Sequence, residues 1–523
     1  MSVLTLIQPG VYRDSVALML LARELGALPG VSAVSVVMGT PANQAVLREA
    51  GLLTSEAQAA SPNDLIIAIQ AQDETRARAA MTQAQTMLAQ KASSAQATGA
   101  ARPRTMRSAI RALPEANVAV ISVAGQYAAA QAWDALRAGL HVLLFSDHVS
   151  VDDEVALKEY AGAHDLLLMG PGAGTAILNG VGLGFANAVP RGDIGIVAAA
   201  GTGLQEVSTL IAKAGAGITQ AIGTGGRDVS EKVGGKMLLH GLQMLQADPE
   251  TRVIVVVSKL PADSVVDKLM AQVAQSDKPT VLALMTNYKL QMTNDKFATR
   301  HSPLATDLRQ AASFAVALSR GESVDDARQK IAAEDRALAG KARALKRKLN
   351  ARQNFLRGLY SGGTLCEETM RIWQAALGGI WSNAPLDPKL QLPDSNVSKR
   401  HTVIDLGEEE FTIGRPHPMI DQELRVKRIL QEARDPRIAA IALDVVIGYG
   451  SNADPASELG AAIREAKQIA AQKKRELIFV ASVTGTDSDP QNLARQTDTL
   501  KQAGVMVLNS NAAVARLTRA LVE

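Results

Sequence analysis

Apolar and polar residues alternate in two rhythms along the chain. Short, continuous apolar runs are typical of buried strands, and the longer segments between them have the spacing of amphipathic helices. In the first 90 residues these rhythms predict strands at 2–7, 31–39 and 64–71 and helices at 13–28 and 73–91. Residues 1–90 are therefore expected to form a small α+β module, and the stretch rich in Ala, Ser and Gln at 91–104 is typical of a linker.

Beyond residue 105 the strands become uniformly apolar, as in "ANVAVISVAG" and "HVLLFSD", and helices alternate with them. This alternation is typical of a parallel sheet that helices cover on both faces. We expect a Rossmann-type domain at 105–190 and a further domain at 191–320. Ligands bind beyond the carboxyl ends of the strands in such sheets, so the loops there are the candidate sites. No GxGxxG motif follows a first strand, and nothing supports a dinucleotide site.

The pattern of the domain at 191–320 occurs twice. A charged helical connector at 321–353 separates it from 354–523, which has the same succession of elements. The segments "MLQADPETRVIVVVS" at 244–258 and "LQEARDPRIAAIALD" at 430–444 each end a helix, turn through Asp-Pro and enter an apolar strand. A duplication of this kind predicts two doubly wound, Rossmann- or flavodoxin-like α/β domains that pack about a pseudo-twofold axis.

Three glycine-rich turns at the carboxyl ends of predicted strands contain the residue types of an anion site. Two of them open a helix directly, and the free N–H groups at such a helix start carry the positive end of the helix dipole. We therefore predict that phosphate or substrate binds to Gly201, Thr202, Gly203, Gly225, Gly226, Arg227, Asp228, Ser361, Gly362, Gly363 and Thr364. Glycine is also used where a helix and a strand pack closely, and this alternative stays open.

The sequence "GRPHPMID" at 414–421 holds a histidine between two prolines. His417 is the one histidine of seven that lies in a rigid turn beside an arginine, so we predict catalytic roles for His417 and Arg415. An arginine fork matches a phosphate or a carboxylate, and histidine hydrogen-bonds a carbonyl oxygen or moves a proton. Alternatively, the prolines fix the start of a helix, with Asp421 in its first turn.

Other polar residues also lie near the ends of predicted strands. The candidates for lining a ligand-binding cleft are Asp421, Asp444 and Asp487, with Asp489 two residues after the last, although Asp is common in such turns for structural reasons. Cys366 lies on the helix after "SGGT" and, with no base nearby in the sequence, is expected to be a packed core residue.

Composition narrows the class of protein. At 523 residues the chain exceeds what one core usually supports, which agrees with several domains. A net charge of +3 and an aromatic content of 3% give no support for nucleic-acid binding, and no apolar run of about 18 residues is present for a membrane span. A single cysteine excludes an internal disulfide and argues against a thiolate metal site. Since the first residues also lack the features of a signal peptide, we expect a cytoplasmic protein without a metal site.

Several motifs resemble successive signatures of the succinyl-CoA synthetase superfamily and, within it, of the FdrA family. They extend over nearly the whole chain and include "MGTPAN", "ISVAGQYAA", "GTGLQE", "GLYSGGTL", "GRPHPMID" and "VTGTDSDPQ". In the synthetases, two ligase domains on separate subunits point paired helices at one phosphohistidine. The resemblance implies that both ligase domains are fused here, at 191–320 and 354–523, behind a CoA-binding-like domain at 105–190.

The resemblance to the FdrA family also implies an activity. This family is associated with oxamate carbamoyltransfer, in which oxalurate and phosphate give oxamate and carbamoyl phosphate during the breakdown of allantoin and purine nitrogen. The resemblance implies a carbamoyltransferase that works in an oligomeric complex with two further protein subunits and without a cofactor.

The sequence differs from that of the synthetases in ways that affect the choice between possible functions. The place of their catalytic histidine, here "LALMTNYKLQMTND" at 282–295, contains no histidine, and their glycine-rich CoA turn is missing. No unassigned stretch is long enough for an ATP-grasp domain. CoA binding is therefore not expected, while an acyl-CoA synthetase, a CoA transferase or a non-catalytic scaffold stay open as alternative functions.

Overall fold

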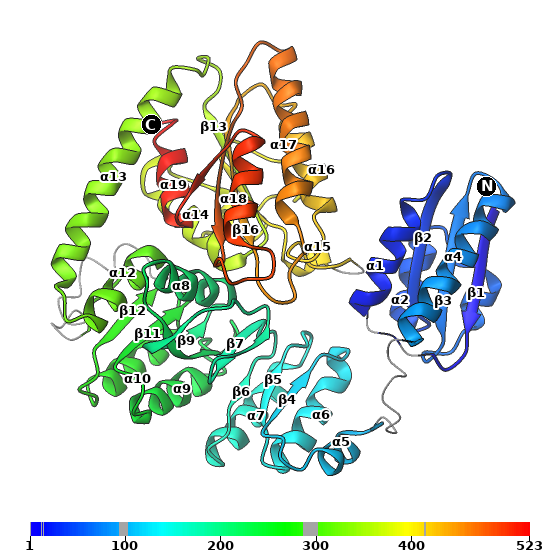
Figure 1. Ribbon diagram of the computed structural model, residues 1–523, viewed down its shortest axis with the longest axis horizontal. Coiled ribbons are helices and arrows are strands. Elements are labelled where there is room, and N and C mark those ends of the chain that lie inside the picture. Colours follow the sequence, from blue (N-terminus) through cyan, green and yellow to red (C-terminus); the bar gives the residue numbers. More distant parts are fainter. Residues whose placement is uncertain (1, 12, 14, 94–102, 286–301, 413–414) are drawn as a thin grey trace. The chain divides into compact units, whose positions relative to one another are not determined.

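The computed structural model describes residues 2–11, 13, 15–93, 103–285, 302–412 and 415–523 (Figure 1). It separates into two compact units, which are considered one at a time. The first consists of Met1–Arg102 with Glu409–Pro416, and the second of Pro103–Glu408 with His417–Glu523. None of the helices in the described ranges is both long and apolar enough to cross a membrane.

The first unit is built on a three-stranded antiparallel sheet. Its strands β1 (Ser2–Gln8), β2 (Val31–Met38) and β3 (Leu65–Ala71) lie in the order β1-β3-β2. Its helices are α1 (Ser15–Gly26), α2 (Pro41–Glu49), α3 (Ser55–Ala59), α4 (Glu74–Ser93) and α15 (Glu409–Thr412).

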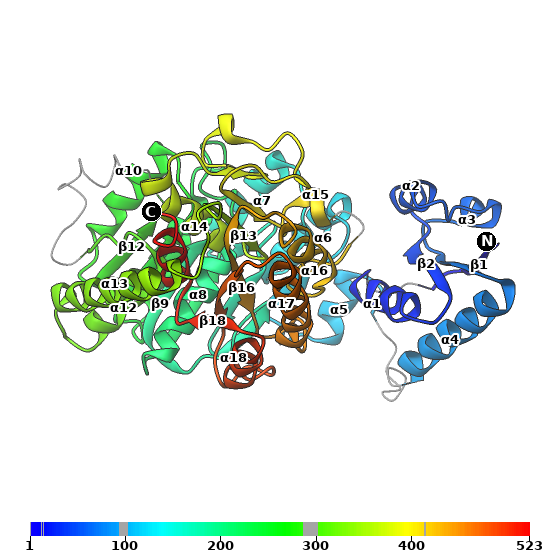
Figure 2. The same cartoon turned by 90° about the horizontal axis from the view of Figure 1, so that it is seen from above.

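The central strand of this sheet is buried on both faces. Leu65 and Ile67 of β3 pack in one core with residues of α1 and α4, whereas Ile66 and Ala68 pack in another with residues of α2 and α3 (Figure 2). Successive side chains of a strand point to opposite faces, so one apolar strand serves both layers. The α+β module predicted for the N-terminal residues is confirmed.

The second unit begins with a small parallel sheet. Its elements are α5 (Met106–Ala112), β4 (Val118–Ile121), α6 (Gly125–Arg137), β5 (His141–Leu144), α7 (Val151–Ala163) and β6 (Leu168–Met169), with strand order β4-β5-β6. The hairpin that follows, β7 (Thr175–Leu178) and β8 (Val181–Gly184), instead pairs with β10 (Ile218–Gly223). The pattern placed residues 105–190 in one domain, but the hairpin extends the neighbouring sheet because it covers the edge of β10.

Two six-stranded sheets form the rest of the second unit (Figure 1). The first, ordered β12-β11-β9-β10-β7-β8, adds β9 (Arg191–Ala199), α8 (Gly201–Lys213), α9 (Lys236–Ala247), β11 (Val253–Ser258), α10 (Asp263–Val273), β12 (Thr280–Leu284) and α12 (Leu308–Ser319). The predicted connector is the helix α13 (Val324–Lys346), one face of which is buried through Ile331 and Leu338.

The second of these sheets has the order β14-β15-β13-β16-β17-β18. Its elements are β13 (Phe355–Tyr360), α14 (Gly363–Leu377), β14 (Trp381–Ser382), η1 (Pro388–Leu390), β15 (Thr402–Asp405), α16 (Glu423–Glu432), β16 (Ile438–Val446), α17 (Pro455–Gln472), β17 (Ile478–Thr484), α18 (Leu493–Gln502), β18 (Val505–Leu508) and α19 (Asn511–Arg519). All its strand pairs are parallel, and helices connect most of its strands. The predicted doubly wound α/β fold is confirmed.

The duplication is visible in strand order and in contacts. The succession β10-β9-β11-β12 corresponds to β15-β13-β16-β17, and α8 and α14 follow the central strands. Glu206, the sixth residue of α8, accepts the backbone N–H of Asn511 at 3.0 Å. Glu368, the sixth residue of α14, accepts that of Leu308 at 2.8 Å. Asn511 and Leu308 begin α19 and α12, so each domain caps a late helix of the other, as pseudo-twofold packing requires.

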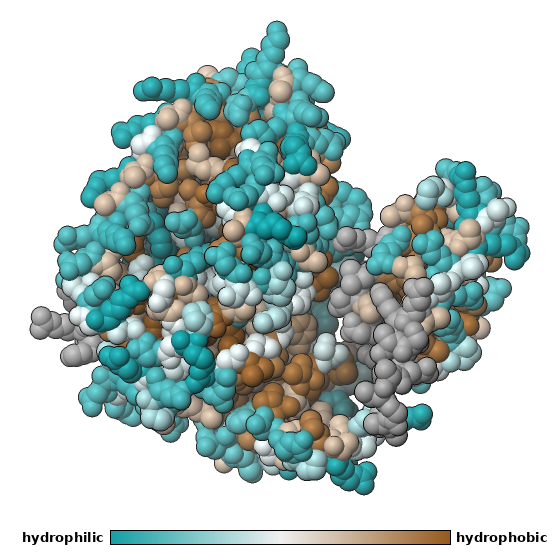
Figure 3. Space-filling model, viewed as in Figure 1, coloured by the Kyte–Doolittle hydropathy of each residue, from teal (hydrophilic) through white to brown (hydrophobic). Residues whose placement is uncertain are grey.

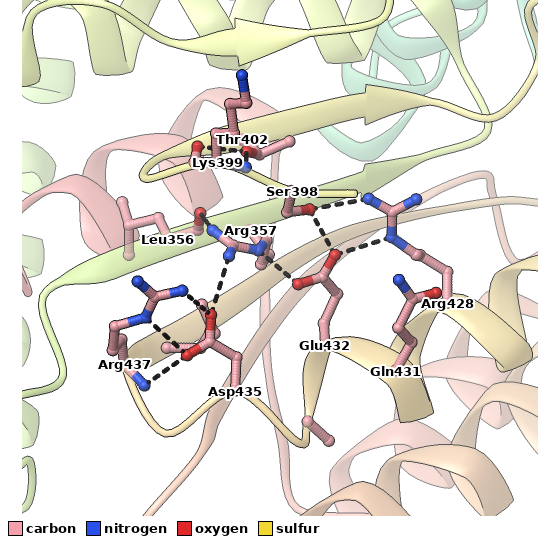
Figure 4. A network of polar contacts seen from close by, with 12 residues as sticks. Leu356, Arg357, Ser398, Lys399, Thr402, Arg428, Gln431, Glu432, Asp435 and Arg437 are labelled. Carbon is pink, nitrogen blue, oxygen red and sulfur yellow. Dashed lines mark hydrogen bonds and ion pairs between the residues drawn. The ribbon is translucent and has the colours of Figure 1, made fainter. Parts of the chain in front are cut away.

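A buried ion network lies at the amino ends of β13, β15 and β16 (Figure 4). Arg357 of β13, which is 1% exposed, donates from Nε to Glu432 at 2.6 Å, and Arg428 donates to the same carboxylate at 2.8 Å. Ser398 also donates to Glu432, and Arg357 pairs with Asp435 at 3.5 Å. These contacts fix the amino ends of the strands, so the opposite ends are where a ligand is expected.

Candidate functional site

The N-termini of α8 and α14 meet where the two duplicated domains face each other. The backbone N–H of Thr364 donates to Oγ1 of Thr202 at 3.2 Å. A Cβ on Gly203 would lie 2.9 Å from Cγ2 of Thr364, and a Cβ on Gly362 would lie 2.8 Å from Cγ2 of Thr202. Cβ atoms do not approach other atoms so closely, so both positions need glycine for the helices to touch. The alternative that glycine permits close packing therefore holds at Gly203 and Gly362.

The start of α14 is already occupied by a carboxylate. Asp444 is fully buried and accepts the N–H groups of Ser361 at 2.9 Å and Gly362 at 2.8 Å, and Arg425 binds the same carboxylate at 2.6 Å. Contrary to the prediction, neither N–H group is free for a phosphate. Asp444 does not line an opening either, because its carboxylate makes the hydrogen bonds and the ion pair that hold this turn.

The start of α8 is open in comparison. Its N-cap residue is Ala200, whose side chain has no hydrogen-bond acceptor, and Gly201 is exposed with no atom within 4 Å of the position of a Cβ. The first N–H groups of a helix have no partner inside the helix and carry partial positive charge. The anion site at Gly201, Thr202 and Gly203 stays a prediction, and this geometry suits it.

His417 lies in a turn that leads into α16. Its Nδ1 accepts the N–H of Met419 at 3.2 Å, so in the neutral ring the proton is on Nε2. Burial lowers the pKa of His417 to about 4, which keeps the ring neutral at physiological pH. Its carbonyl oxygen accepts the N–H of Ile420 at 2.7 Å and that of Asp421 at 3.1 Å. His417 thus shapes the turn and retains an Nε2–H donor, while a pKa this low argues against the predicted proton shuttling near neutral pH.

Two residues that the sequence did not single out lie beside His417. Asp405 ends β15, and its Oδ1 accepts the N–H of Gly407 at 2.9 Å. A Cβ on Gly407 would lie 2.7 Å from Nε2 of His417 and 3.2 Å from Oδ1 of Asp405. A Cβ on Gly363 would lie 2.7 Å from Oδ2 of Asp405 and 3.9 Å from Nζ of Lys259. Asp405 and Lys259 therefore lie close to the start of α14, and Gly407 and Gly363 pack so tightly against Asp405 and His417 that neither position has room for a side chain.

Asp405 has the environment of a group that exchanges a proton near neutral pH. The residue is 4% exposed, and burial raises its pKa to about 7, to which the charge of Glu408 adds. The N–H of Gly407 and the charge of Lys259 act in the opposite direction. A perturbed carboxyl group in such a place is a functional candidate. The rule that ligands bind beyond strand ends would have found both residues, because Asp405 ends a strand and Lys259 follows one.

The third glycine-rich turn, at 225–228, is structural. Asp228 is fully buried and accepts hydrogen bonds from Nζ of Lys158 at 2.8 Å and from the N–H of Leu238 at 2.7 Å. Arg227 pairs with Glu154 at 3.0 Å. Lys158 and Glu154 belong to α7, so these contacts join the small parallel sheet to the next domain. They engage the charged groups of Arg227 and Asp228, contrary to the prediction that these two bind phosphate, whereas phosphate binding at Gly225 and Gly226 stays a prediction.

The acidic candidates near the later strands have separate roles. Asp421 accepts the N–H of Glu423 at 2.7 Å, but it lies before Gln422, the N-cap of α16, and not in the first turn of the helix as the alternative predicted. Asp487 is exposed and accepts the N–H of Ala494 at 3.2 Å. Asp489 is 3% exposed and accepts the N–H of Ala188 at 2.6 Å. None of these contacts brings the three carboxylates to the meeting point of α8 and α14.

Arg415 is exposed and belongs to the first unit, so its action together with His417 stays a prediction. Cys366 is 1% exposed, and burial raises the pKa of its thiol well above the usual value, as expected of a packed core residue. Within the described ranges, no group of three or more His, Cys, Asp or Glu is placed to hold a metal ion. Residues 286–295, where the histidine of the synthetases is missing, lie outside the described part of the chain.

Three known family models match parts of the chain. The one described as "AllF, heavy metal-associated domain" matches residues 1–104, the CoA-binding domain matches 191–283, and CoA-ligase matches 359–521. Residues 1–104 contain neither Cys nor His, the ligands that soft metal ions prefer, so they do not fit the metal in that description. The two CoA-related models fall on the domains that contain α8 and α14.

The chain is 42% identical over 523 residues to the uncharacterized protein YahF of Escherichia coli (strain K12), a match that covers 99% of this chain and 98% of YahF. It is 26% identical over 168 residues to the alpha subunit of an ADP-forming succinate–CoA ligase from Methanothermobacter thermautotrophicus, covering 32% of this chain and 56% of that subunit. Among solved structures, the dinucleotide-forming acetyl-coenzyme A synthetase 1 of Ca. Korarchaeum cryptofilum matches with a TM-score of 0.32 and 14% identity, over 77% of this chain and 82% of that one.

Proposed function

Because the chain belongs to the same family as YahF and consists of domains like those of succinyl-CoA synthetase, we propose that it transfers a carbamoyl group. The proposed reaction converts oxalurate and phosphate to oxamate and carbamoyl phosphate, in the breakdown of allantoin and purine nitrogen, with two further subunits. The resemblance to the FdrA family supports this choice. The observation that carries it is that the start of α8 meets the start of α14, where the buried carboxyl group of Asp405 lies against Gly363.

Each requirement of carbamoyl transfer is met by a group near the meeting point of α8 and α14. Phosphate needs positive potential, which the first N–H groups of α8 and the ammonium group of Lys259 supply. The carbamoyl oxygen gains negative charge as its carbon is attacked, and a preorganised donor stabilises that charge. The Nε2–H of His417 is such a donor, and the low pKa keeps it a neutral one.

An acyl-CoA ligase is the second candidate because the CoA-binding and CoA-ligase models match the two domains. The residues present do not fit CoA well. The glycine-rich turn with which the synthetases bind CoA is missing from the sequence. We therefore assign no residue to CoA.

The test is a reconstituted assay. The full-length chain, alone and with its two partner subunits, is incubated with carbamoyl phosphate and oxamate, and both phosphate release and oxalurate are followed. Oxalurate formation without CoA or nucleotide supports the proposal. Turnover that requires CoA and a nucleotide refutes it in favour of the ligase, and binding without turnover in every combination refutes it in favour of a scaffold.

A further inference from the structure

Two buried carboxyl groups lie where the duplicated domains meet. Glu206, the sixth residue of α8, is 1% exposed, and Glu368, the sixth residue of α14, is 2% exposed. Both bind Asn511 at the start of α19: Glu206 accepts its backbone N–H at 3.0 Å, and Glu368 accepts an N–H of its side-chain amide at 2.8 Å. Because one residue bridges them, these two acidic groups, the carboxyl pair, lie close together in a place that solvent hardly reaches.

The contacts of the carboxyl pair do not compensate two negative charges. Neither group forms an ion pair with any residue that the structure describes. Besides Asn511, Glu206 accepts the hydroxyl of Thr484 at 2.5 Å. Glu368 accepts the backbone N–H of Leu308 at 2.8 Å. Hydrogen bonds from neutral donors offset only part of the cost of burying a charge, and two like charges also repel each other, so one member of the pair is expected to keep its proton.

The hydrogen bonds of Asn511 point to the same conclusion. Its Nδ2 also donates to the carbonyl oxygen of Leu365 at 2.9 Å, and since a carbonyl oxygen only accepts, the orientation of the amide is fixed. Oδ1 of Asn511 is then a buried acceptor that no donor in the described part of the chain reaches. The cluster thus holds more acceptors than donors, and a proton on a carboxyl group reduces this excess.

Of the two, Glu206 is better placed to be ionised. Lys213 of the same helix donates to the carbonyl oxygen of Val483 at 2.7 Å, next to Thr484, and its positive charge attracts the carboxylate of Glu206. This attraction acts over more than the length of an ion pair, but it favours a negative charge on Glu206.

The surroundings of Glu368 disfavour its charged form. The titratable and charged groups that face it from other elements are Glu206 of α8, Asp307 at the start of α12, Tyr360 of β13 and Arg516 of α19. Arg516 already pairs with Asp307 at 2.6 Å and with Asp335 at 3.1 Å, so little of its charge acts on the carboxyl pair. Burial raises the pKa of Glu368 above its ordinary value of 4.5, and the charges of Asp307 and Glu206 raise it further.

We propose that Glu368 is a positioning residue whose neutral carboxyl group keeps the starts of α8 and α14 together, and that loss of its proton opens this contact. The threonines that join the helix starts at 3.2 Å, Thr202 and Thr364, each lie four residues before a member of the carboxyl pair and on the same helix face. A second negative charge one helical turn behind this contact repels the first. The candidate site at the helix starts is therefore sensitive to pH whichever reaction it carries, so the inference does not rest on the proposed function.

The direction of the pH effect follows from the two states of Glu368. In the open contact the group meets water and its pKa is near the ordinary value of 4.5, whereas the closed contact binds the proton more tightly. The closed contact therefore loses stability as the pH rises above 4.5, by about tenfold in the opening equilibrium for each pH unit, until the group is ionised in the closed contact as well. At lower pH the group is protonated in both states, and the effect disappears.

Hydrogen exchange of the full-length chain, followed by mass spectrometry from pH 5.5 to pH 7.5, measures this opening. After correction for the intrinsic exchange rates, exchange at the starts of α14 and α12 should rise at least about 100-fold over this range in the wild type. Glu368→Gln carries no charge at either pH, and its rise should be smaller by about tenfold for each pH unit. The control Glu367→Gln changes the neighbouring carboxylate, which pairs with Arg371 at 2.6 Å, and should follow the wild type.

Infrared spectroscopy of the wild type tests for the proton directly, without a substitution. When the side-chain carboxyl carbon of glutamate is labelled with a heavier carbon isotope, the band of a protonated glutamate shifts, whereas the band of a protonated aspartate does not. At pH 7 we expect a shifted carboxylic-acid band from a buried glutamate, since exposed glutamates are ionised, and Glu368→Gln should lack this band.

Absence of a protonated glutamate at pH 7, or an equal rise in exchange with pH in Glu368→Gln and the wild type, overturns the inference. A shifted band that Glu368→Gln lacks, together with its smaller rise in exchange, supports the inference. Neither readout uses turnover, so failure of carbamoyl transfer in the reconstituted assay refutes the proposed function alone.

Discussion

Replacing Asp405 with asparagine should stabilise the folded protein at alkaline pH. The carboxyl group has a pKa of about 7 in the folded protein, against an ordinary value of 3.8, because burial disfavours its charged form and Glu408 repels it. The folded state therefore binds this proton more tightly than the unfolded state, and stability falls as pH rises through the window between these two values. At about 1.4 kcal/mol for each pKa unit, the ionised carboxylate destabilises the folded protein by about 4 kcal/mol above pH 7.

Asparagine removes the charge and retains the shape of the side chain. Its Oδ1 is able to accept the N–H of Gly407 as the carboxylate does at 2.9 Å. At pH 8 we expect Asp405→Asn to be more stable than the wild type by about 2–4 kcal/mol. The difference should shrink as the pH is lowered toward 4, because the wild-type carboxyl group is then neutral as well.

The assay is urea unfolding of the full-length proteins from pH 5 to pH 8. Tryptophan fluorescence follows the unfolding, since two of the three tryptophans, Trp373 and Trp381, lie in the domain that contains Asp405. Asp394→Asn, which changes an exposed carboxylate of the same domain, serves as the control and should have the same stability difference from the wild type at every pH. A variant that is no more stable than the wild type at pH 8 would refute the reasoning, since the charge of Asp405 would then be well compensated in the folded state.

Three further predictions test the site and the core. His417→Ala should lower turnover by about 100-fold, whereas His417→Gln, which retains an N–H donor, should keep more of it; near wild-type turnover of His417→Ala would leave only the structural role. Glu432→Ala leaves the buried guanidinium of Arg357 without this ion pair and should lower the free energy of unfolding in urea by about 3–5 kcal/mol. The control Glu423→Ala removes an exposed ion pair and should lower it by less than about 1 kcal/mol; equal effects of the two substitutions would contradict this. The thiol of Cys366 should react with a thiol reagent only after unfolding, because burial raises its pKa; rapid labelling of the native protein would show the opposite.

The fold was predictable because its signals are local. Apolar runs bounded by turns identify strands such as β11 and β16, and the Asp-Pro turn that precedes each reveals the duplication. The predicted domain boundary at residue 190 separates the hairpin β7–β8 from its partner strand, β10, which lies more than thirty residues further along the chain. Such pairing depends on which sheet edge is left uncovered in the folded protein.

The site was less predictable because equivalent residue types end in different environments. Asp444 and Asp405 both lie at the carboxyl ends of apolar strands. The N–H groups of a turn 83 residues away and Arg425 bind the carboxylate of Asp444, whereas the carboxyl group of Asp405 accepts one hydrogen bond from the described residues, from the N–H of Gly407. The positions of both residues in the sequence make them candidates for a functional site. Only the tertiary contacts distinguish the carboxylate that stabilises a turn from the one with fewer hydrogen bonds.

The reciprocal caps between the duplicated domains also bear on how the chain folds. Glu206 and Glu368 are both nearly fully buried, and each binds the first N–H group of a helix that belongs to the other domain. A single domain expressed alone would expose one of these carboxylates to water and leave the first N–H group of one helix without its acceptor. The two domains should therefore unfold together as one cooperative unit, and a chain cut in α13 should recover native stability only when both halves are present.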